Sequence, residues 1–159
     1  MFIKNVTEED VPILRDLAER NYPLDVHTHY TYWVLCSQFW ECCYILYDDN
    51  KAIGYITSLY NDKTVFVWQI AISKDYRGKG YSQLLIDKVA MLARTKGMNM
   101  KVTIATDNKA SYNSFYRYCL NHDMKMYEAG NVDLIDLNDK EFHENEVVYN
   151  MDFKNNVGE

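Results

Sequence analysis

The chain has 159 residues, of which 48% are hydrophobic and 25% charged, and its formal net charge at pH 7 is −6. This length allows one domain with a core of its own, and the acidic balance argues against a nucleic-acid-binding protein, which would carry a basic face. No apolar run approaches the roughly 20 residues of a membrane span, and the opening residues lack a signal-peptide pattern. We therefore expect a cytoplasmic protein that has neither nucleic acid nor a membrane as a partner.

The first part of the chain predicts a strand over residues 2–6 and a helix that ends at Asn21-Tyr22-Pro23. Thr7 can cap this helix, because the turn that follows it is acidic and Pro12 stands near the helix start. A second helix is expected over residues 28–39. A β-hairpin follows, with strands over 43–47 and 52–60.

Asp25, Thr28 and Tyr32 fall near one face of the expected second helix. They form either the polar wall of a pocket or an N-cap followed by aromatic residues that fill the core. His27 and His29, beside Asp25, raise the question of a metal site. Residues two apart do not face each other on a helix and no complete ligand set is visible, so we expect no metal.

The four cysteines show no Cys-x-x-Cys spacing of the kind found in metal and redox sites. We interpret them as reduced thiols of a cytoplasmic protein, mostly buried. A catalytic cysteine is the alternative, but no flanking sequence suggests an activating partner. The four are Cys36, Cys42, Cys43 and Cys119.

The stretch over residues 64–82 predicts a buried strand over 64–72, a turn, a glycine-rich loop and the start of a helix. Both faces of the strand are apolar, so we expect it in the middle of a sheet with both sides covered. Gly78 and Gly80 let the backbone take left-handed angles and approach a ligand closely, and the next helix begins with unpaired amides at its positive end. Such a loop attracts phosphate; a plain surface turn with a basic tip is the alternative. Alternation places Val65, Val67 and Ala71 on one face of the strand and Phe66, Trp68, Ile70 and Ile72 on the other.

The second half predicts a helix from Tyr81 that stops at Gly97 and another that opens at residues 107–111. We expect one domain over residues 1–153 and a frayed tail over 154–159. The remaining expected elements are strands over 99–106, 124–128 and 147–153 and a low-pattern loop over 129–140.

The segment Arg77-Gly78-Lys79-Gly80-Tyr81-Ser82 resembles the Arg/Gln-x-x-Gly-x-Gly/Ala signature of the GNAT superfamily of N-acetyltransferases, with serine where glycine or alanine is usual. The resemblance implies an α/β (α+β) domain with a mixed, mostly antiparallel sheet of six to seven strands flanked by about four helices. It also implies acetyl-CoA as co-substrate, with its pyrophosphate held by this loop. The residues expected to bind the cofactor are Ile70, Ala71, Ile72, Arg77, Gly78, Lys79, Gly80, Tyr81, Ser82, Asn108, Ser111 and Phe115.

Asn108-Lys109-Ala110-Ser111 also resembles this superfamily, in which a tyrosine seven residues after the asparagine often protonates the departing thiolate. Phe115 stands in that place here, with Tyr116 beside it. Adjacent helical side chains diverge by about 100°, so Tyr116 cannot simply replace the acid, although it is kept as a candidate. A thiolate whose thiol has a pKa of ~8.5 is a fair leaving group, so a missing acid is tolerable.

Three further motifs resemble, in matching order, the L-2,4-diaminobutyrate acetyltransferases of ectoine biosynthesis. They are Leu24-Asp25-x-x-Thr28-x-Tyr30-x-Tyr32, the strand around Trp68-Gln69, and His143-Glu144-x-Glu146-Val147-x-Tyr149, in which Asn145 stands where that family usually has Asp. This resemblance implies a homodimer that acetylates the 4-amine, with Asp25, Trp68 and Glu146 holding the substrate. The expected substrate-binding residues also include Thr28, Tyr30, Tyr32, Gln69 and Glu144.

The expected reaction is direct attack of an amine on the thioester in a ternary complex. Only the neutral amine is a nucleophile, and with a pKa of ~10.4 its deprotonation costs roughly 4 kcal/mol at pH 7. Some group must accept the proton, directly or through water, and Glu146 and His143 are the candidates. A backbone amide near residues 70–72 is expected to polarise the thioester carbonyl. An acetyltransferase for another small diamine or amino acid, and a non-catalytic acetyl-CoA-binding sensor, stay open as alternatives.

Overall fold

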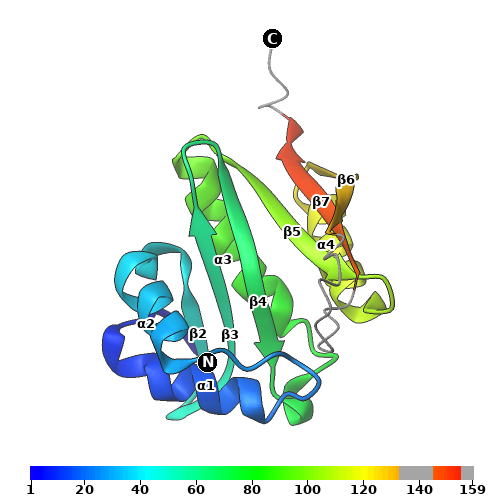
Figure 1. Ribbon diagram of the computed structural model, residues 1–159. Helices are drawn as coiled ribbons and strands as arrows, with labels where there is room; N and C mark the ends of the chain where they lie inside the picture. Colours follow the sequence, from blue (N-terminus) through cyan, green and yellow to red (C-terminus); the bar gives the residue numbers. More distant parts are fainter. Residues whose placement is uncertain (133–144, 155–159) are drawn as a thin grey trace, which may run out of the picture.

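The computed structural model describes residues 1–132 and 145–154 (Figure 1). Most elements begin and end within two residues of the predicted bounds. The helices are α1 (Val11–Glu19), α2 (His29–Gln38), α3 (Tyr81–Thr95) and α4 (Lys109–Asn121), with short 3₁₀ turns at Glu8–Asp10, Trp40–Cys42 and Lys74–Tyr76. The strands are β1 (Phe2–Asn5), β2 (Tyr44–Asp48), β3 (Lys51–Tyr60), β4 (Thr64–Ile72), β5 (Asn99–Ala105), β6 (Met124–Val132) and β7 (Glu146–Phe153).

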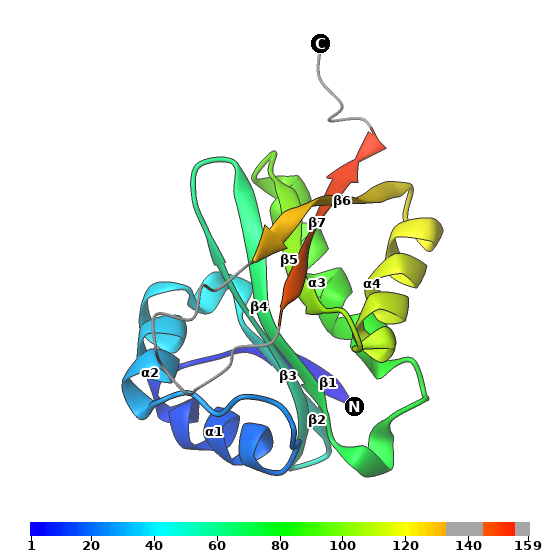
Figure 2. The same ribbon diagram turned by 45° about the vertical axis from the view of Figure 1, so that its right-hand side comes forward.

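Within the described residues, the strands form one seven-stranded sheet in the order β1-β2-β3-β4-β5-β7-β6. Every neighbouring pair is antiparallel except β4 and β5, which run parallel. Helices α1 and α2 cover one face of the sheet and α3 and α4 cover the other (Figures 1 and 2). The predicted architecture, a mixed and mostly antiparallel sheet flanked by about four helices, is confirmed.

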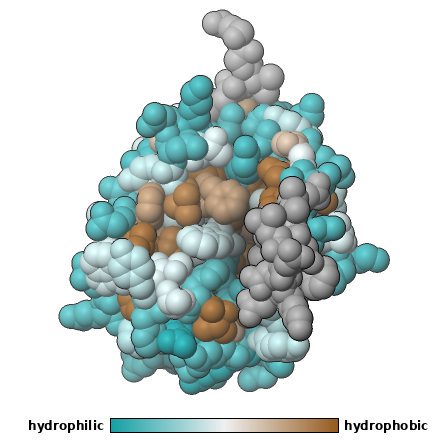
Figure 3. Space-filling view, in the orientation of Figure 1, coloured by the Kyte–Doolittle hydropathy of each residue, from teal (hydrophilic) through white to brown (hydrophobic). Residues whose placement is uncertain are grey.

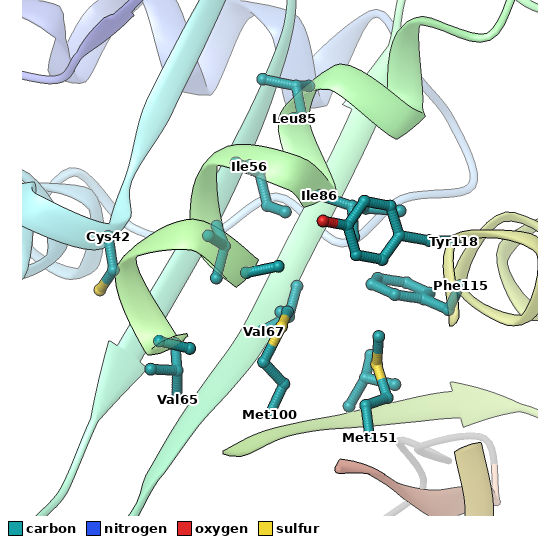
Figure 4. Packing of buried hydrophobic residues seen from close by; sticks show 14 of the residues in the cluster. Cys42, Ile56, Val65, Val67, Leu85, Ile86, Met100, Phe115, Tyr118 and Met151 are labelled. Carbon is teal, nitrogen blue, oxygen red and sulfur yellow. The ribbon is translucent and has the colours of Figure 1, made fainter. Parts of the chain in front are cut away.

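Each face of the sheet has its own apolar core. Between the sheet and α3 and α4, residues such as Leu85, Phe115 and Met151 pack together (Figure 4). On the other face, residues such as Leu14 and Tyr55 pack with the helices α1 and α2. The central strand β4 contributes to both cores, as expected of a strand covered on both sides.

The predicted alternation along β4 is wrong beyond Trp68. Ser58 of β3 pairs with Val67 and Thr57 pairs with Gln69, so Trp68 is an extra residue in the ladder, a β-bulge. Because side chains alternate with a period of two, one inserted residue exchanges the faces of everything that follows. Val65 and Val67 therefore face α3 and α4, but Ala71 belongs to the core beside α1 and α2, and Ile70 and Ile72 pack with the α3 and α4 side.

Strands β4 and β5 are paired over only part of their lengths. Their ladder runs from Thr64 opposite Asn99 to Val67 opposite Val102. Beyond this point β4 continues to Ile72 and β5 to Ala105, but no further pairs join them. The two strands diverge (Figure 1), and the edge of β4 that faces β5 loses its ladder partners at the bulge.

Strand β6 is longer than predicted. Residues 129–132, expected in a loop, continue the strand, and Gly130, Asn131 and Val132 pair with β7. The register shifts between Glu128 and Gly130, where Gly130 has a φ of 135°. An irregular, glycine-containing strand lacks the alternating pattern by which strands are recognised in a sequence. The rest of the predicted loop and residues 155–159 of the predicted tail lie outside the described residues.

None of the described helices has the length and apolar character needed to cross a membrane. All four cysteines are buried and free, as predicted for the thiols. In the orientation of Figure 1, several hydrophobic residues gather near the centre of the molecular face, and hydrophilic residues lie along its left and upper rim (Figure 3).

Candidate functional site

A cavity of about 610 Å³ lies where β4 and β5 diverge. Its wall combines the ends of both strands, the glycine-rich loop, the starts of α3 and α4, and the segment that follows α1. A second chamber of about 340 Å³ adjoins it. The two chambers share six lining residues, Leu24, Asp25, Trp68, Gln69, Thr103 and Glu146.

The glycine-rich loop has the predicted left-handed backbone. Gly78 and Gly80 have φ values of 73° and 81°, and Gly80 is the N-cap of α3. The backbone amides of Arg77 and Gln83 donate to Lys74 and Gly80 oxygens at 3.3 and 3.1 Å. Among the described residues, no backbone oxygen accepts a hydrogen bond from the amides of Gly78 to Ser82. These N–H groups lie at the positive end of α3 and can donate to a ligand. This arrangement fits a diphosphate group.

The Arg77 side chain is held within the protein. Its Nε donates to the carbonyl oxygen of Ile72 at 2.9 Å, and its Nη2 donates to Oδ1 of Asn21 at 2.7 Å. Asn21 is itself buried and donates to the carbonyl oxygen of Leu17 at 2.6 Å. Arg77 thus joins the glycine-rich loop to the end of β4 and to the segment after α1. Sequence reasoning missed Asn21, which it interpreted only as a helix breaker.

Helix α4 opens at Asn108, as the sequence predicts, and its start lines the same cavity as the glycine-rich loop. Oδ1 of Asn108 accepts a hydrogen bond from the backbone amide of Ser111 at 3.1 Å, which caps the helix. Both residues and the buried Phe115 line the larger cavity. Tyr116 does not line either chamber; it is 41% exposed and stacks on Tyr112 at 5.7 Å. Its position on α4 agrees with the expectation that it cannot simply take the place of Phe115.

Gln69 is the centre of a buried hydrogen-bond network. Its Oε1 accepts from the hydroxyls of Tyr55 and Tyr32 at 2.8 and 3.2 Å, and its Nε2 donates to the backbone oxygen of Asp25 at 2.6 Å. Burial raises the pKa of both tyrosines, so both hydroxyls stay protonated and act as donors. Gln69 and Tyr32, which the sequence places in the substrate site, are occupied here in holding the segment before α2.

Asp25, Trp68 and Glu146, the three residues expected to hold the substrate, line the second chamber together. The bulge leaves Trp68 42% exposed. Glu146 begins β7, and its Oε2 accepts from the hydroxyl of Thr103 on β5 at 2.9 Å. The chamber therefore combines two carboxylates with an aromatic face, a combination that suits a cation. Thr103 was not predicted, because a single threonine in a strand carries no signal.

The remaining residues predicted to bind the substrate do not line either chamber or lie outside the described residues. Thr28 caps α2, with its Oγ1 accepting from the amide of Thr31 at 3.2 Å, so the capping role considered for Asp25 belongs to Thr28. Tyr30 is 72% exposed and stacks on Trp33 at 6.0 Å. His143 and Glu144 lie outside the described residues. No group of three metal-ligating side chains occurs in the described part of the chain.

His27 also lines the second chamber, although sequence reasoning considered it only as a metal ligand. Its ring lies 4.8 Å from that of Trp68 and 5.5 Å from that of Tyr32. Burial lowers the pKa of the imidazole, and the nearby charge of Asp25 partly opposes this shift. The neutral form of His27 is therefore favoured in the folded protein.

Comparisons with known proteins agree with this geometry. The model of the acetyltransferase (GNAT) family matches residues 11–119. The L-2,4-diaminobutyric acid acetyltransferase of Chromohalobacter salexigens is 32% identical over 123 residues, covering 74% of this chain and 64% of that protein. The protein of the same name from Shouchella clausii is 30% identical over 120 residues, covering 73% of this chain and 67% of that protein. The chain thus spans about two thirds of the length of these relatives.

A solved structure has the same fold. It is the diaminobutyrate acetyltransferase EctA from Paenibacillus lautus in complex with L-2,4-diaminobutyric acid and coenzyme A. The TM-score is 0.82, with 18% sequence identity, and the likeness covers 99% of this chain and 96% of that chain.

Proposed function

We propose that this chain, which belongs to the acetyltransferase (GNAT) family, transfers the acetyl group of acetyl-CoA to the 4-amino group of L-2,4-diaminobutyrate, a step of ectoine biosynthesis. The relatives that carry this name match most of the chain. The observation that carries the proposal is the common wall of the two chambers. It joins a loop suited to a diphosphate with an acidic, aromatic chamber suited to a short diamine.

Acetyl-CoA would lie in the larger chamber. The amides of residues 78–82 would bind its diphosphate at the start of α3, and Asn108, Ser111 and Phe115 would border the arm that leads to the thioester. The edge of β4 beyond Val67 no longer pairs with β5. We propose that a backbone amide of Ile70, Ala71 or Ile72 on this edge donates to the thioester oxygen, where negative charge develops as the amine attacks.

Diaminobutyrate would lie in the second chamber. At neutral pH it carries two ammonium groups and one carboxylate, so its binding needs negative charge at two places. Asp25 and Glu146 supply that charge, and Trp68 offers its face to an ammonium or to the aliphatic chain. The attack is direct, the C–S bond breaks as the thiolate leaves, and no acyl-enzyme forms. The sequence names Glu146 and His143 as the candidate proton acceptors, and His143 lies outside the described residues.

The proposal is tested by mixing the purified protein with acetyl-CoA and L-2,4-diaminobutyrate and following thiol release, with the acetylated nitrogen identified by NMR. The expected product is the 4-N-acetyl derivative. Spermidine, which lacks a carboxylate, and lysine, which has a longer chain, serve as comparison amines. Faster turnover of either amine would move the assignment to another substrate. Thermal stabilisation by acetyl-CoA without turnover of any amine would favour a sensor.

We also propose a homodimer that works in the cytoplasm, with the domain over residues 1–153. The four buried free thiols suit a reducing compartment, and exposed aromatic side chains such as Trp40 and Tyr116 suit a contact between copies. Analytical ultracentrifugation tests the dimer, and a single species of monomer mass at micromolar concentration would rule it out.

A further inference from the structure

The buried Nε2 of His27 has no hydrogen-bond partner among the described residues. An unpaired polar atom that is shielded from water destabilises the folded protein, so such an atom calls for an explanation. Four other side-chain atoms share this condition, Arg15 Nε, Thr57 Oγ1, Ser58 Oγ and Asn150 Oδ1. Of the five residues, His27 is the one that lines a chamber of the site.

The rest of His27 is held firmly. Its backbone amide donates to the hydroxyl of Tyr32 at 3.4 Å, and Tyr32 is in turn bound to Gln69. The ring lies against Trp68 and Tyr32. These contacts fix the imidazole at the wall of the chamber through its backbone and its ring faces, and Nε2 keeps no partner among the described residues.

The charged and titratable groups around the imidazole come from three parts of the chain. Asp25 precedes it in the same segment, Tyr32 faces it from α2, and Glu146 lines the same chamber from β7. The strand β4 presents the uncharged Trp68 and Gln69. Burial outweighs the effect of Asp25, so the pKa of His27 lies below its ordinary value and the ring is an unprotonated base at pH 7.

We propose that Nε2 of His27 accepts the proton of the attacking nitrogen when diaminobutyrate reacts, an assignment that rests on the proposed function. The 4-ammonium group first gives one proton to water, which supplies the neutral amine. The nitrogen lone pair then forms the new C–N bond and the carbonyl π electrons move to oxygen. The N–H becomes acidic as positive charge develops on nitrogen, and its proton passes to His27. The C–S bond then breaks, the thiolate leaves, and the imidazolium returns the proton to the thiolate or to water.

This assignment separates two tasks that conflict in one group. A carboxylate near an ammonium binds it but raises its pKa, which opposes the loss of the proton. Glu146, fixed by the hydroxyl of Thr103, suits the binding task. A neutral imidazole receives the proton without stabilising the ammonium as strongly, and it is the group that most often serves as a general base.

The test compares His27→Gln with the matched control His29→Gln, two residues away on the exposed start of α2. For the wild type, kcat is expected to fall as the pH decreases through the pKa of His27, below about 6.5, because protonation removes the base. His27→Gln is expected to lower kcat about 100-fold, within the range of general-base catalysis, and to abolish this acidic limb. The KM for acetyl-CoA is expected to stay unchanged, and His29→Gln is expected to resemble the wild type.

A His27→Gln enzyme that keeps the acidic limb and at least a third of the wild-type kcat would overturn the assignment. Loss of the limb in Glu146→Gln instead would give the role to the carboxylate. If His27→Gln does not fold, NMR titration of the ¹³C-labelled His27 ring in the wild type replaces it. The diamine is expected to lower the pKa of His27 by at least half a unit, and an unmoved pKa would count against the proposal. Inertness of the wild type toward every amine would refute the proposed function itself.

Discussion

The side-chain amide of Gln69 donates to the backbone oxygen of Asp25 at 2.6 Å and so fixes the segment between α1 and α2 to the central strand. Gln69 is 5% exposed, and its other end accepts from two buried tyrosine hydroxyls. It acts on the chamber by positioning Asp25 and His27.

Replacing Gln69 with leucine should therefore affect both stability and substrate binding. Tyr55, Tyr32 and the oxygen of Asp25 would lose a buried partner, at about 1–3 kcal/mol for each group left unsatisfied. We expect the free energy of unfolding to fall by at least 2 kcal/mol in denaturant titrations and the KM for diaminobutyrate to rise about tenfold. The exposed Gln38 on α2 provides the matched control Gln38→Leu. Equal stability of the two variants would contradict the role of the network.

Gly80→Ala should weaken coenzyme A binding. Gly80 has a φ of 81°, and a left-handed residue with a side chain costs about 1–2 kcal/mol. Relief of this strain would turn the amides of the loop away from the diphosphate. Gly97 has a φ of 68° and lies after α3, away from both chambers. Gly97→Ala therefore introduces a similar backbone strain at a position that does not contact the coenzyme A site. Calorimetry is expected to show at least tenfold weaker coenzyme A binding for Gly80→Ala alone, and equal losses in both variants would exclude a specific role for the loop.

Glu146→Gln should weaken the binding of the diamine and leave that of acetyl-CoA intact. The amide keeps the size of the side chain and can still accept from Thr103, but it removes the charge that faces an ammonium. A hydrogen bond to a charged group contributes about 1.5–3 kcal/mol, so we expect a rise of at least tenfold in the KM for diaminobutyrate. Glu128→Gln, on the exposed part of β6, is the control. An unchanged KM would remove Glu146 from the substrate site.

The thiols should be inert in the folded protein. Burial raises the pKa of Cys36 and of Cys119 to about 12, and only the thiolate is a good nucleophile. Because these values lie above pH 9, labelling by a disulfide reagent is expected to stay slow between pH 7 and pH 9. All four cysteines are expected to react after unfolding. Rapid labelling of one thiol under native conditions would point to an accessible and functional cysteine.

The features that the sequence predicts well are those that local patterns determine. The apolar strand before Gly78 and Gly80, the left-handed loop and the helix after it depend on neighbouring residues, and all three are present. Asp25, Trp68 and Glu146 come together as the resemblance implies, although they are far apart in the chain.

The features that escaped prediction depend on residues distant in sequence. The pairing of Arg77 with Asn21 joins positions 56 residues apart, and either side chain alone suggests only a surface cation or a helix end. The place of His27 depends on where α2 begins and on the ring of Trp68 from another strand. The bulge at Trp68 cannot be recognised from the composition of an apolar strand. The prediction therefore kept the same alternation of faces beyond Trp68, where the structure reverses it.

The bulge also gives β4 an unusual mutational signature. Its first half sends odd-numbered residues toward α3 and α4, and its second half sends even-numbered residues there. A saturation scan through Thr64–Ile72 should therefore show a period-two tolerance profile whose phase inverts at Trp68. Deleting this one residue would restore an unbroken ladder in which Val67 and Gln69 still face Ser58 and Thr57, so Gln69 would keep its layer and the chamber would lose only the indole of Trp68.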